Sequence, residues 1–122
     1  MTERFPKARR LRFRRQFLRV QRRGRRLDGH QLFLFVARDR SRGQRFGFTV
    51  SKKVGKAVTR NRVRRRLREM VRTHRQAFPM GFHYVIVARP GAATTEFGRL
   101  KDDLLHLAQK VSSSMTSKAQ AD

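Results

Sequence analysis

The chain contains no cysteine and no tryptophan, and it has few acidic residues. Without cysteine it has neither a disulfide framework nor a thiolate metal site, which suits a reducing compartment. Long apolar runs are missing as well, since none approaches the roughly 18 residues that indicate a membrane-spanning helix. The N-terminus also lacks the apolar core of a signal peptide. These absences predict a cytoplasmic protein that has no membrane partner.

Positive charge dominates what is present. The chain has 32 lysines and arginines against 8 acidic residues, a net charge of +24. Residues 1–75 carry 27 basic and 4 acidic side chains, whereas residues 76–122 carry 5 and 4. Arginine outnumbers lysine 25 to 7, and its planar guanidinium forms paired hydrogen bonds to phosphate and stacks on bases. The composition therefore predicts a nucleic-acid partner that faces the first two-thirds of the chain.

The length and the apolar content favour one folded domain. The 122 residues are 38% hydrophobic and include 10 phenylalanines, which is too apolar for a wholly disordered basic tail. We expect a flexible arm at residues 1–8, a single domain at residues 9–111 and a flexible tail at residues 112–122.

Hydrophobic periodicity predicts three helices and three strands. The helices are expected at Arg12 to Arg23, Thr59 to Ala77 (capped by Thr59) and Thr95 to Val111, and the strands at Leu32 to Arg38, Arg45 to Ser51 and Phe82 to Arg89. The inward stripes of the last two helices are expected to be Val63, Leu67, Met70, Val71 and His74, and Phe97, Leu100, Leu104, Leu107, Ala108 and Val111. The first two strands are expected to form an antiparallel hairpin. The second helix is long enough to connect two parallel strands, so we expect an α+β sheet layered with helices.

The most unusual segment runs from Val50 to Glu69, where nine positions are lysine or arginine and only the last is acidic. A solvated helix face would carry charges of both signs. A helix lying on a membrane would have a wider apolar face with tryptophan. Nucleic-acid binding is favoured, because the arginines sweep nearly around the helix and reach phosphates on several strands. A folded RNA suits this arrangement better than one groove of duplex DNA.

Phenylalanine supplies a second candidate surface. Six rings lie in the first helix and the first two strands, among several arginines, and such rings stack bases in single-stranded RNA. They are Phe13, Phe17, Phe33, Phe35, Phe46 and Phe48. Most rings at such spacing are core residues, so only Phe17 and Phe35 are taken as candidates for binding.

Catalytic and metal-binding patterns are weak. Asp102 and Asp103 with His106 have the helical spacing of a metal site, but such residues more often form the wet face of a helix. Walker, dinucleotide-binding and zinc patterns do not occur. The sequence predicts neither a catalytic residue nor a metal site on this chain.

The run from Ser51 to Glu69, with Arg60, Asn61 and Arg62 at its centre, resembles the signature of the bacterial ribonuclease P protein subunit. Arg10, Leu11, Phe17 and Gly24 are similar to the family's N-terminal helix. The resemblance extends from about Arg9 to Val111.

This resemblance implies an αβββαβα sandwich like the second domain of ribosomal protein S5. Its mixed sheet would have a left-handed βαβ crossover, against the usual rule, and an extra strand near Arg25 to Asp28. It also implies a ribonucleoprotein endonuclease that removes the 5′ leader of precursor tRNA. The catalytic groups and the Mg2+ ions would then belong to the RNA subunit. The alternatives are a small ribosomal-type RNA-binding protein and a nucleoid DNA-binding protein.

The resemblance also assigns roles to residues. The contact surface for ribonuclease P RNA, with one protein for each RNA, would be Lys52, Lys53, Lys56, Arg60, Asn61, Arg62, Arg65 and Arg68. The cleft for the single-stranded leader would contain Phe17 and Phe35. Gln21 stands where the family often has another aromatic residue, so base stacking at that point is expected to be weaker.

Overall fold

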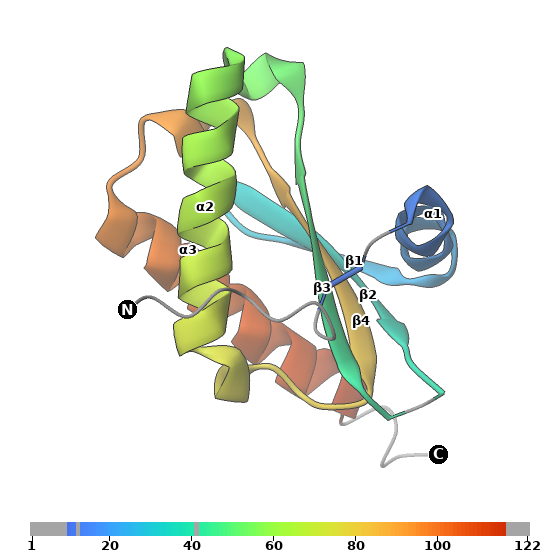
Figure 1. Ribbon diagram of the computed structural model, residues 1–122. Coiled ribbons are helices and arrows are strands. Elements are labelled where there is room, and N and C mark those ends of the chain that lie inside the picture. The colour runs from blue at the N-terminus through green and yellow to red at the C-terminus, as the bar shows by residue number, and fades with distance from the viewer. Residues whose placement is uncertain (1–9, 12, 41, 117–122) are drawn as a thin grey trace.

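The structure is a computed structural model that describes residues 10–116 apart from residues 12 and 41. It contains three α-helices and four strands (Figure 1), which are α1 (Arg14–Arg23), β1 (Arg25–Asp28), β2 (Leu32–Arg38), β3 (Gln44–Val50), α2 (Ala57–Thr73), β4 (Phe82–Ala88) and α3 (Phe97–Val111). The predicted αβββαβα order is confirmed, including the short strand β1. The predicted arm at residues 1–8 lies outside the described residues. Within the described residues, no helix has the length and hydropathy to cross a bilayer.

The four strands form one mixed sheet in the order β1-β2-β4-β3. The predicted hairpin between β2 and β3 is wrong, because β4 lies between them, antiparallel to β2 and parallel to β3. Tyr84, Val85 and Ile86 of β4 are all fully buried, so this strand takes the centre of the sheet, where both faces and both edges are covered. The connection from β3 through α2 to β4 is the predicted parallel crossover. Its left-handed sense stays a prediction.

Helices cover the two faces of the sheet unequally. Figure 1 shows α2 and α3 on one side and α1 alone on the other. The larger core lies under α2 and α3, where the inward faces of β2, β3 and β4 meet the buried stripes of both helices. A smaller cluster lies under α1 and consists of Leu11, Val20 and Val85. Because α1 is only 10 residues long, it leaves part of its face of the sheet uncovered.

Helix α2 begins and ends earlier than its pattern predicts. Lys56 is its N-cap, not Thr59, and the helix ends at Thr73 before a short 3-10 turn at Arg75–Ala77. Near the end, the Thr73 hydroxyl donates back to the backbone oxygen of Glu69, one turn earlier, at 2.9 Å, a local hydrogen bond that threonine often makes within a helix. The predicted inward positions 63, 67, 70 and 71 are buried, whereas His74 is the C-cap and is partly exposed.

Helix α3 differs from its prediction at both ends. Phe97 was expected to face inward but is 43% exposed, because it occupies the first turn and the buried stripe begins at Leu100. Ser112–Thr116, within the predicted tail, continues the helix as a π-helical turn, and the flexibility of the tail stays a prediction. The rest of the tail, residues 117–122, lies outside the described residues.

Asp103 was expected on the wet face of α3 but is buried. Its carboxylate accepts backbone N–H groups from His30, Gln31 and Leu32 at 2.8, 2.8 and 2.9 Å. These three groups belong to the turn between β1 and β2 and to the first residue of β2. Asp103 therefore joins α3 to the sheet, and no spacing within α3 predicts this long-range role.

Candidate nucleic-acid interface

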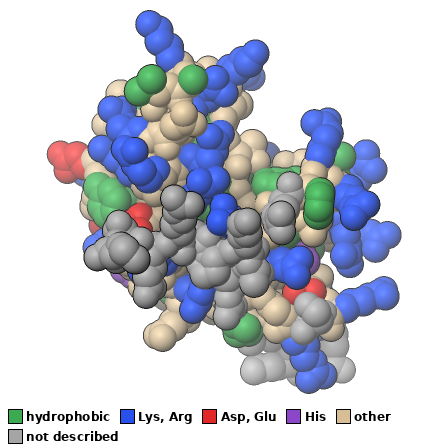
Figure 2. Space-filling view, viewed as in Figure 1, with side chains coloured by type: hydrophobic (Ala, Val, Ile, Leu, Met, Phe, Trp, Pro, Cys, Tyr) green, Lys and Arg blue, Asp and Glu red, His purple; other side chains and the backbone are tan. Residues whose placement is uncertain are grey.

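The predicted RNA-contact residues form one continuous surface at the N-terminal end of α2 and along its outer side. We call the set Lys52, Lys53, Lys56, Arg60, Asn61, Arg62, Arg65 and Arg68 the basic surface. Figure 2 shows lysine and arginine side chains over this helix with few acidic neighbours. The three lysines are exposed. They stand beside the positive end of the helix dipole, where anions and not cations are stabilised.

The N-terminal part of α2 is held to the loops around it. Buried Val54 anchors the 3-10 turn that carries Lys52 and Lys53. The Arg60 guanidinium donates to the backbone oxygen of Gly55 at 3.2 Å, and Arg62 donates to that of Ala93 at 3.3 Å. These contacts to neutral carbonyls fix the position of the cationic groups and leave their charge uncompensated.

Asn61 orients a neighbouring arginine. Its side-chain oxygen accepts a hydrogen bond at 3.0 Å from Arg64, one turn further along α2. Arg65 lies on the outer side of the helix and is exposed. Asn61 thus contributes to the basic surface by positioning a guanidinium, in addition to presenting its own amide.

Arg68 and Arg10 form a pair of like charges that the sequence did not single out. The Nε atoms of both are buried and have no hydrogen-bond partner among the described residues. Burial lowers the pKa of Arg68, and the nearby charges of Arg10 and Arg64 lower it further. Arg10 reaches this place because its backbone forms a parallel bridge with Phe46 at the edge of the sheet. Two adjacent guanidinium groups without a counter-charge form a ready site for phosphate.

The only acidic residue of the segment is already engaged. Glu69 accepts hydrogen bonds from Arg72 at 2.6 and 3.0 Å. The hydrogen bond from Arg72 lowers the pKa of Glu69. No free carboxylate within Val50 to Glu69 therefore neutralises the basic surface, which agrees with a polyanionic partner.

The two predicted stacking residues meet on the opposite face of the sheet. Phe17 of α1 and Phe35 of β2 both pack against the small cluster of Leu11, Val20 and Val85 and remain partly exposed. Phe17 lies directly over Gly47, where an added Cβ would stand 2.5 Å from the ring. A glycine at this position lets the ring approach β3 closely.

Phe33 extends this surface and was not retained as a candidate. It lies on the same face of β2 as Phe35, with ring centroids 5.9 Å apart. The guanidinium groups of Arg26 and Arg89 lie 4.0 and 4.9 Å from its ring centroid. Alternation along β2 is the signal that joins these residues. We call the set Phe17, Phe33, Phe35 and Val87 the ring surface.

The cations beside Phe33 are already paired with a carboxylate. Asp28 accepts hydrogen bonds from Arg26 at 3.1 Å and from Arg89 at 2.9 Å. The hydrogen bond from Arg26 is the largest cause of the lowered pKa of Asp28, and Arg89 adds to it. The other three rings lie elsewhere: Phe46 is fully buried in the main core, Phe48 packs against that core, and Phe13 is 52% exposed beside Arg15.

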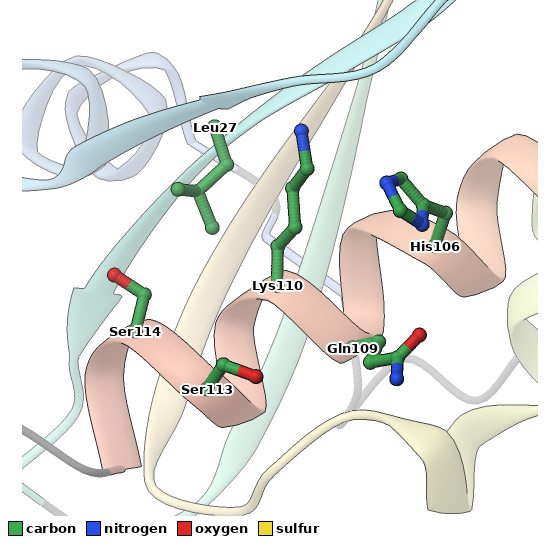
Figure 3. A pocket seen from close by; sticks show the side chains of 6 residues that line it. All are labelled: Leu27, His106, Gln109, Lys110, Ser113 and Ser114. Carbon is green, nitrogen blue, oxygen red and sulfur yellow. The ribbon is translucent and has the colours of Figure 1, made fainter.

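The residues considered for a metal site do not form one. Asp103 is used by three backbone N–H groups, and the described residues contain no group of three histidine or carboxylate side chains suited to a metal ion. His106 instead lines a pocket of about 450 Å³ between β1 and the end of α3 (Figure 3). Among the described residues that line this pocket, Lys110 is the one lysine or arginine, and it donates to the backbone oxygen of Asp28 at 2.6 Å.

Comparison with known proteins identifies the family of this chain. The family model described as Ribonuclease P matches residues 5–112. The chain belongs to the ribonuclease P protein family. Among its relatives, the ribonuclease P protein component of Gluconacetobacter diazotrophicus is 44% identical over 106 residues, 85% of this chain and 91% of that protein. The component of Dictyoglomus thermophilum is 37% identical over 108 residues, covering 87% and 90%.

Solved structures of ribonuclease P proteins share the fold. The protein from Thermotoga maritima is 30% identical, and its structure aligns with a TM-score of 0.77. The alignment covers 83% of this chain and 96% of that one. The protein from Staphylococcus aureus is 25% identical, with a TM-score of 0.78 and coverage of 86% and 96%. The chain is thus a ribonuclease P protein subunit with a role in 5′ processing of tRNA, and the holoenzyme is an endoribonuclease. This assignment excludes the ribosomal and nucleoid alternatives.

Proposed function

We propose that the basic surface binds the ribonuclease P RNA and that the ring surface holds the 5′ leader of precursor tRNA. The observation that carries the first assignment is the Arg10 and Arg68 pair, whose buried Nε atoms have no partner among the described residues. A phosphate group beside this pair supplies the negative charge that the two guanidinium groups lack. Arg60 and Arg62 lie on the same helix, about two turns closer to its N-terminus than Arg68.

The ring surface supports the second assignment. Its aromatic groups are partly exposed and lie on the face of the sheet opposite α2. Bases of a single strand stack on such rings with little regard to sequence. The two surfaces therefore bind different RNA segments, and the leader adds affinity that mature tRNA does not have.

The protein acts on RNA folding and on substrate affinity, and the RNA subunit supplies the catalytic groups. Guanidinium groups neutralise crowded phosphates, which lowers the Mg2+ concentration that the RNA needs in order to fold and dock. The Mg2+ ions of the reaction are held by the RNA. A single basic surface corresponds to one protein for each RNA, and the absence of cysteine suits work in the cytoplasm.

Removing charge from α2 tests RNA docking. We expect the triple variant Arg60→Gln, Arg62→Gln, Arg65→Gln to bind ribonuclease P RNA more weakly and to reduce the slope of log affinity against log salt by roughly 2–3. A matched control variant, Arg75→Gln, Arg99→Gln, Lys101→Gln, removes the same charge outside the basic surface. Equal binding by the two variants would reject the assignment of the basic surface.

Removing a ring tests leader binding in the assembled holoenzyme. We expect Phe17→Ala to weaken binding of leader-bearing precursor tRNA by roughly five- to a hundredfold, the contribution of one stacked base, and to leave binding of mature tRNA unchanged. Phe97→Ala removes an exposed ring far from this face and serves as the control. Equal losses for precursor and mature tRNA would contradict the role of the ring surface.

A further inference from the structure

A second concentration of arginine lies beside α1, away from the basic surface. A recess of about 790 Å³ opens between the end of α1, the start of β1 and the end of β2. Its lining contains five arginines, which are Arg19, Arg23, Arg25, Arg38 and Arg40, together with Gly24, Val36 and Ala37. We call it the arginine recess. Figure 2 shows the lysine and arginine side chains gathered over α1, at the right of the molecule.

The cations of the arginine recess are unpaired. Among the described residues, none of the five forms an ion pair, and no acidic side chain lines the recess. The nearest carboxylate in sequence, Asp39, has its Oδ2 atom 3.0 Å from Nε2 of His83. By contrast, Arg26 and Arg89 on the other side of α1 share Asp28. A recess with five arginines and no carboxylate in its described lining attracts an external anion.

The arginine recess and the ring surface lie on opposite flanks of the same helix. At 3.6 residues per turn, Arg19 and Arg23 project to one side of buried Val20, and Phe17 and Gln21 project to the other. On β2 beneath, Ala37 belongs to the recess and Phe33 to the ring surface. Val20 is 1% exposed, so the helix seals the space between the two flanks.

The end of α1 joins the two flanks. Gly24 brings the helix so close to β2 that an added Cβ would stand 2.7 Å from the backbone oxygen of Val36. The chain turns into β1 at Arg25, which lines the recess. A flexible strand that leaves the ring surface can pass around this corner, beside Arg25, and enter the recess.

We propose that the arginine recess binds the phosphate backbone of the precursor tRNA leader, upstream of the nucleotides that stack on the ring surface. This rests on the proposed function of the ring surface. The recess has the volume of a small-ligand site, which fits a short single strand and not a duplex. It shares α1 and one sheet face with the ring surface, whereas the basic surface lies on the opposite face. Arginine forks grip phosphates without reading the bases.

The test is a leader-length series with the assembled holoenzyme. The recess variant Arg19→Gln, Arg38→Gln, Arg40→Gln is compared with wild type and with the control variant Arg75→Gln, Arg99→Gln, Lys101→Gln. The substrates are mature tRNA, a precursor whose leader is only long enough to reach the ring surface, and a precursor with a longer leader. We expect the recess variant to lose about tenfold in affinity for the long-leader substrate and to reduce its salt slope by roughly 2, the effect of three single-strand phosphate contacts. Its affinity for the other two substrates should equal that of wild type.

Two results would overturn the proposal. One is wild-type affinity of the recess variant for the long-leader substrate. The other is an equal loss with all three substrates, which would assign the recess to the body of the tRNA or to the ribonuclease P RNA. A failure of the proposed function would be seen in a different measurement. In that case, Phe17→Ala would bind the short-leader precursor as tightly as wild type.

Discussion

Replacing Asp103 tests how α3 holds the sheet in position. This carboxylate is 5% exposed and accepts three backbone N–H groups, from His30, Gln31 and Leu32. Those groups begin the strand that carries Phe33 and Phe35 of the ring surface. The replacement Asp103→Ala removes the acceptor from all three donors at once.

The expected loss follows from the burial of the three donors. A hydrogen bond to a charged acceptor contributes about 1.5–3 kcal/mol, but the three do not add. The N–H groups of His30 and Gln31 are only part-buried, so they bind water in the variant, whereas the N–H of Leu32 is buried and stays unpaired. We expect the free energy of unfolding to fall by about 2–4 kcal/mol, out of the roughly 5–15 kcal/mol that holds a domain together. The corresponding fall in Tm is roughly 10–15 °C.

Urea and thermal unfolding followed by circular dichroism measure this effect. Asp103→Asn keeps one acceptor oxygen, so its stability should lie between those of wild type and Asp103→Ala. Asp102→Ala, at the exposed neighbouring position on α3, is the control. If Asp103→Ala unfolds within about 0.5 kcal/mol of Asp102→Ala, the three hydrogen bonds do not hold the turn and the reasoning is wrong.

Three further predictions concern the face of the sheet that α1 covers. Gly47→Ala places a Cβ 2.5 Å from the Phe17 ring, so we expect about 1–3 kcal/mol of destabilisation. We also expect the variant to bind precursor tRNA more weakly and mature tRNA as tightly as wild type. Unchanged binding of precursor tRNA would show that the position of the Phe17 ring is unimportant. Gln21→Phe adds a ring one turn from Phe17 and should tighten precursor binding roughly fivefold or more, and no change would mean that Gln21 does not border the leader. Burial lowers the pKa of His83 below its ordinary value of 6.5, although Asp39 opposes the shift. The unfolded chain then takes up the proton first, so stability is full above about pH 6.5 and falls as the pH drops below it. His83→Gln should lose less stability than wild type between about pH 7.5 and about pH 5.5 in urea unfolding, and equal losses would refute this.

Local pattern was sufficient to predict the three helices, three of the four strands and the chemical character of both surfaces. The stripe of Val63, Leu67, Met70 and Val71 predicted the buried side of α2, and these residues are buried. The arginines between them lie on the exposed and partly exposed sides of the helix. The resemblance to a known family added β1, which is short and mostly exposed and so carries no periodic signal.

Pairing over long distances could not be predicted in this way. The hairpin of β2 and β3 was wrong because the choice of neighbour depends on β4, some forty residues later, whose two apolar faces need a place between them. Phe97 and Asp103 were misplaced for a similar reason. Whether a position on α3 meets solvent or the β1–β2 turn depends on how the helix lies on the sheet.

The sequence alone determined that this protein carries a rigid arginine-rich helix, that its core is apolar, and that its partner is an anion too large to be a small molecule. These properties depend on composition and on spacing within one element, which burial and charge repulsion convert directly into an inside and an outside. Only the tertiary structure decided that the charge of Arg10 lies near that of Arg68, that Phe17 lies over Gly47, and that five arginines from α1, β1, the end of β2 and the turn after it line one recess. Each of these contacts joins residues far apart in the chain, and they exist because packing around β4 fixes where every other element lies.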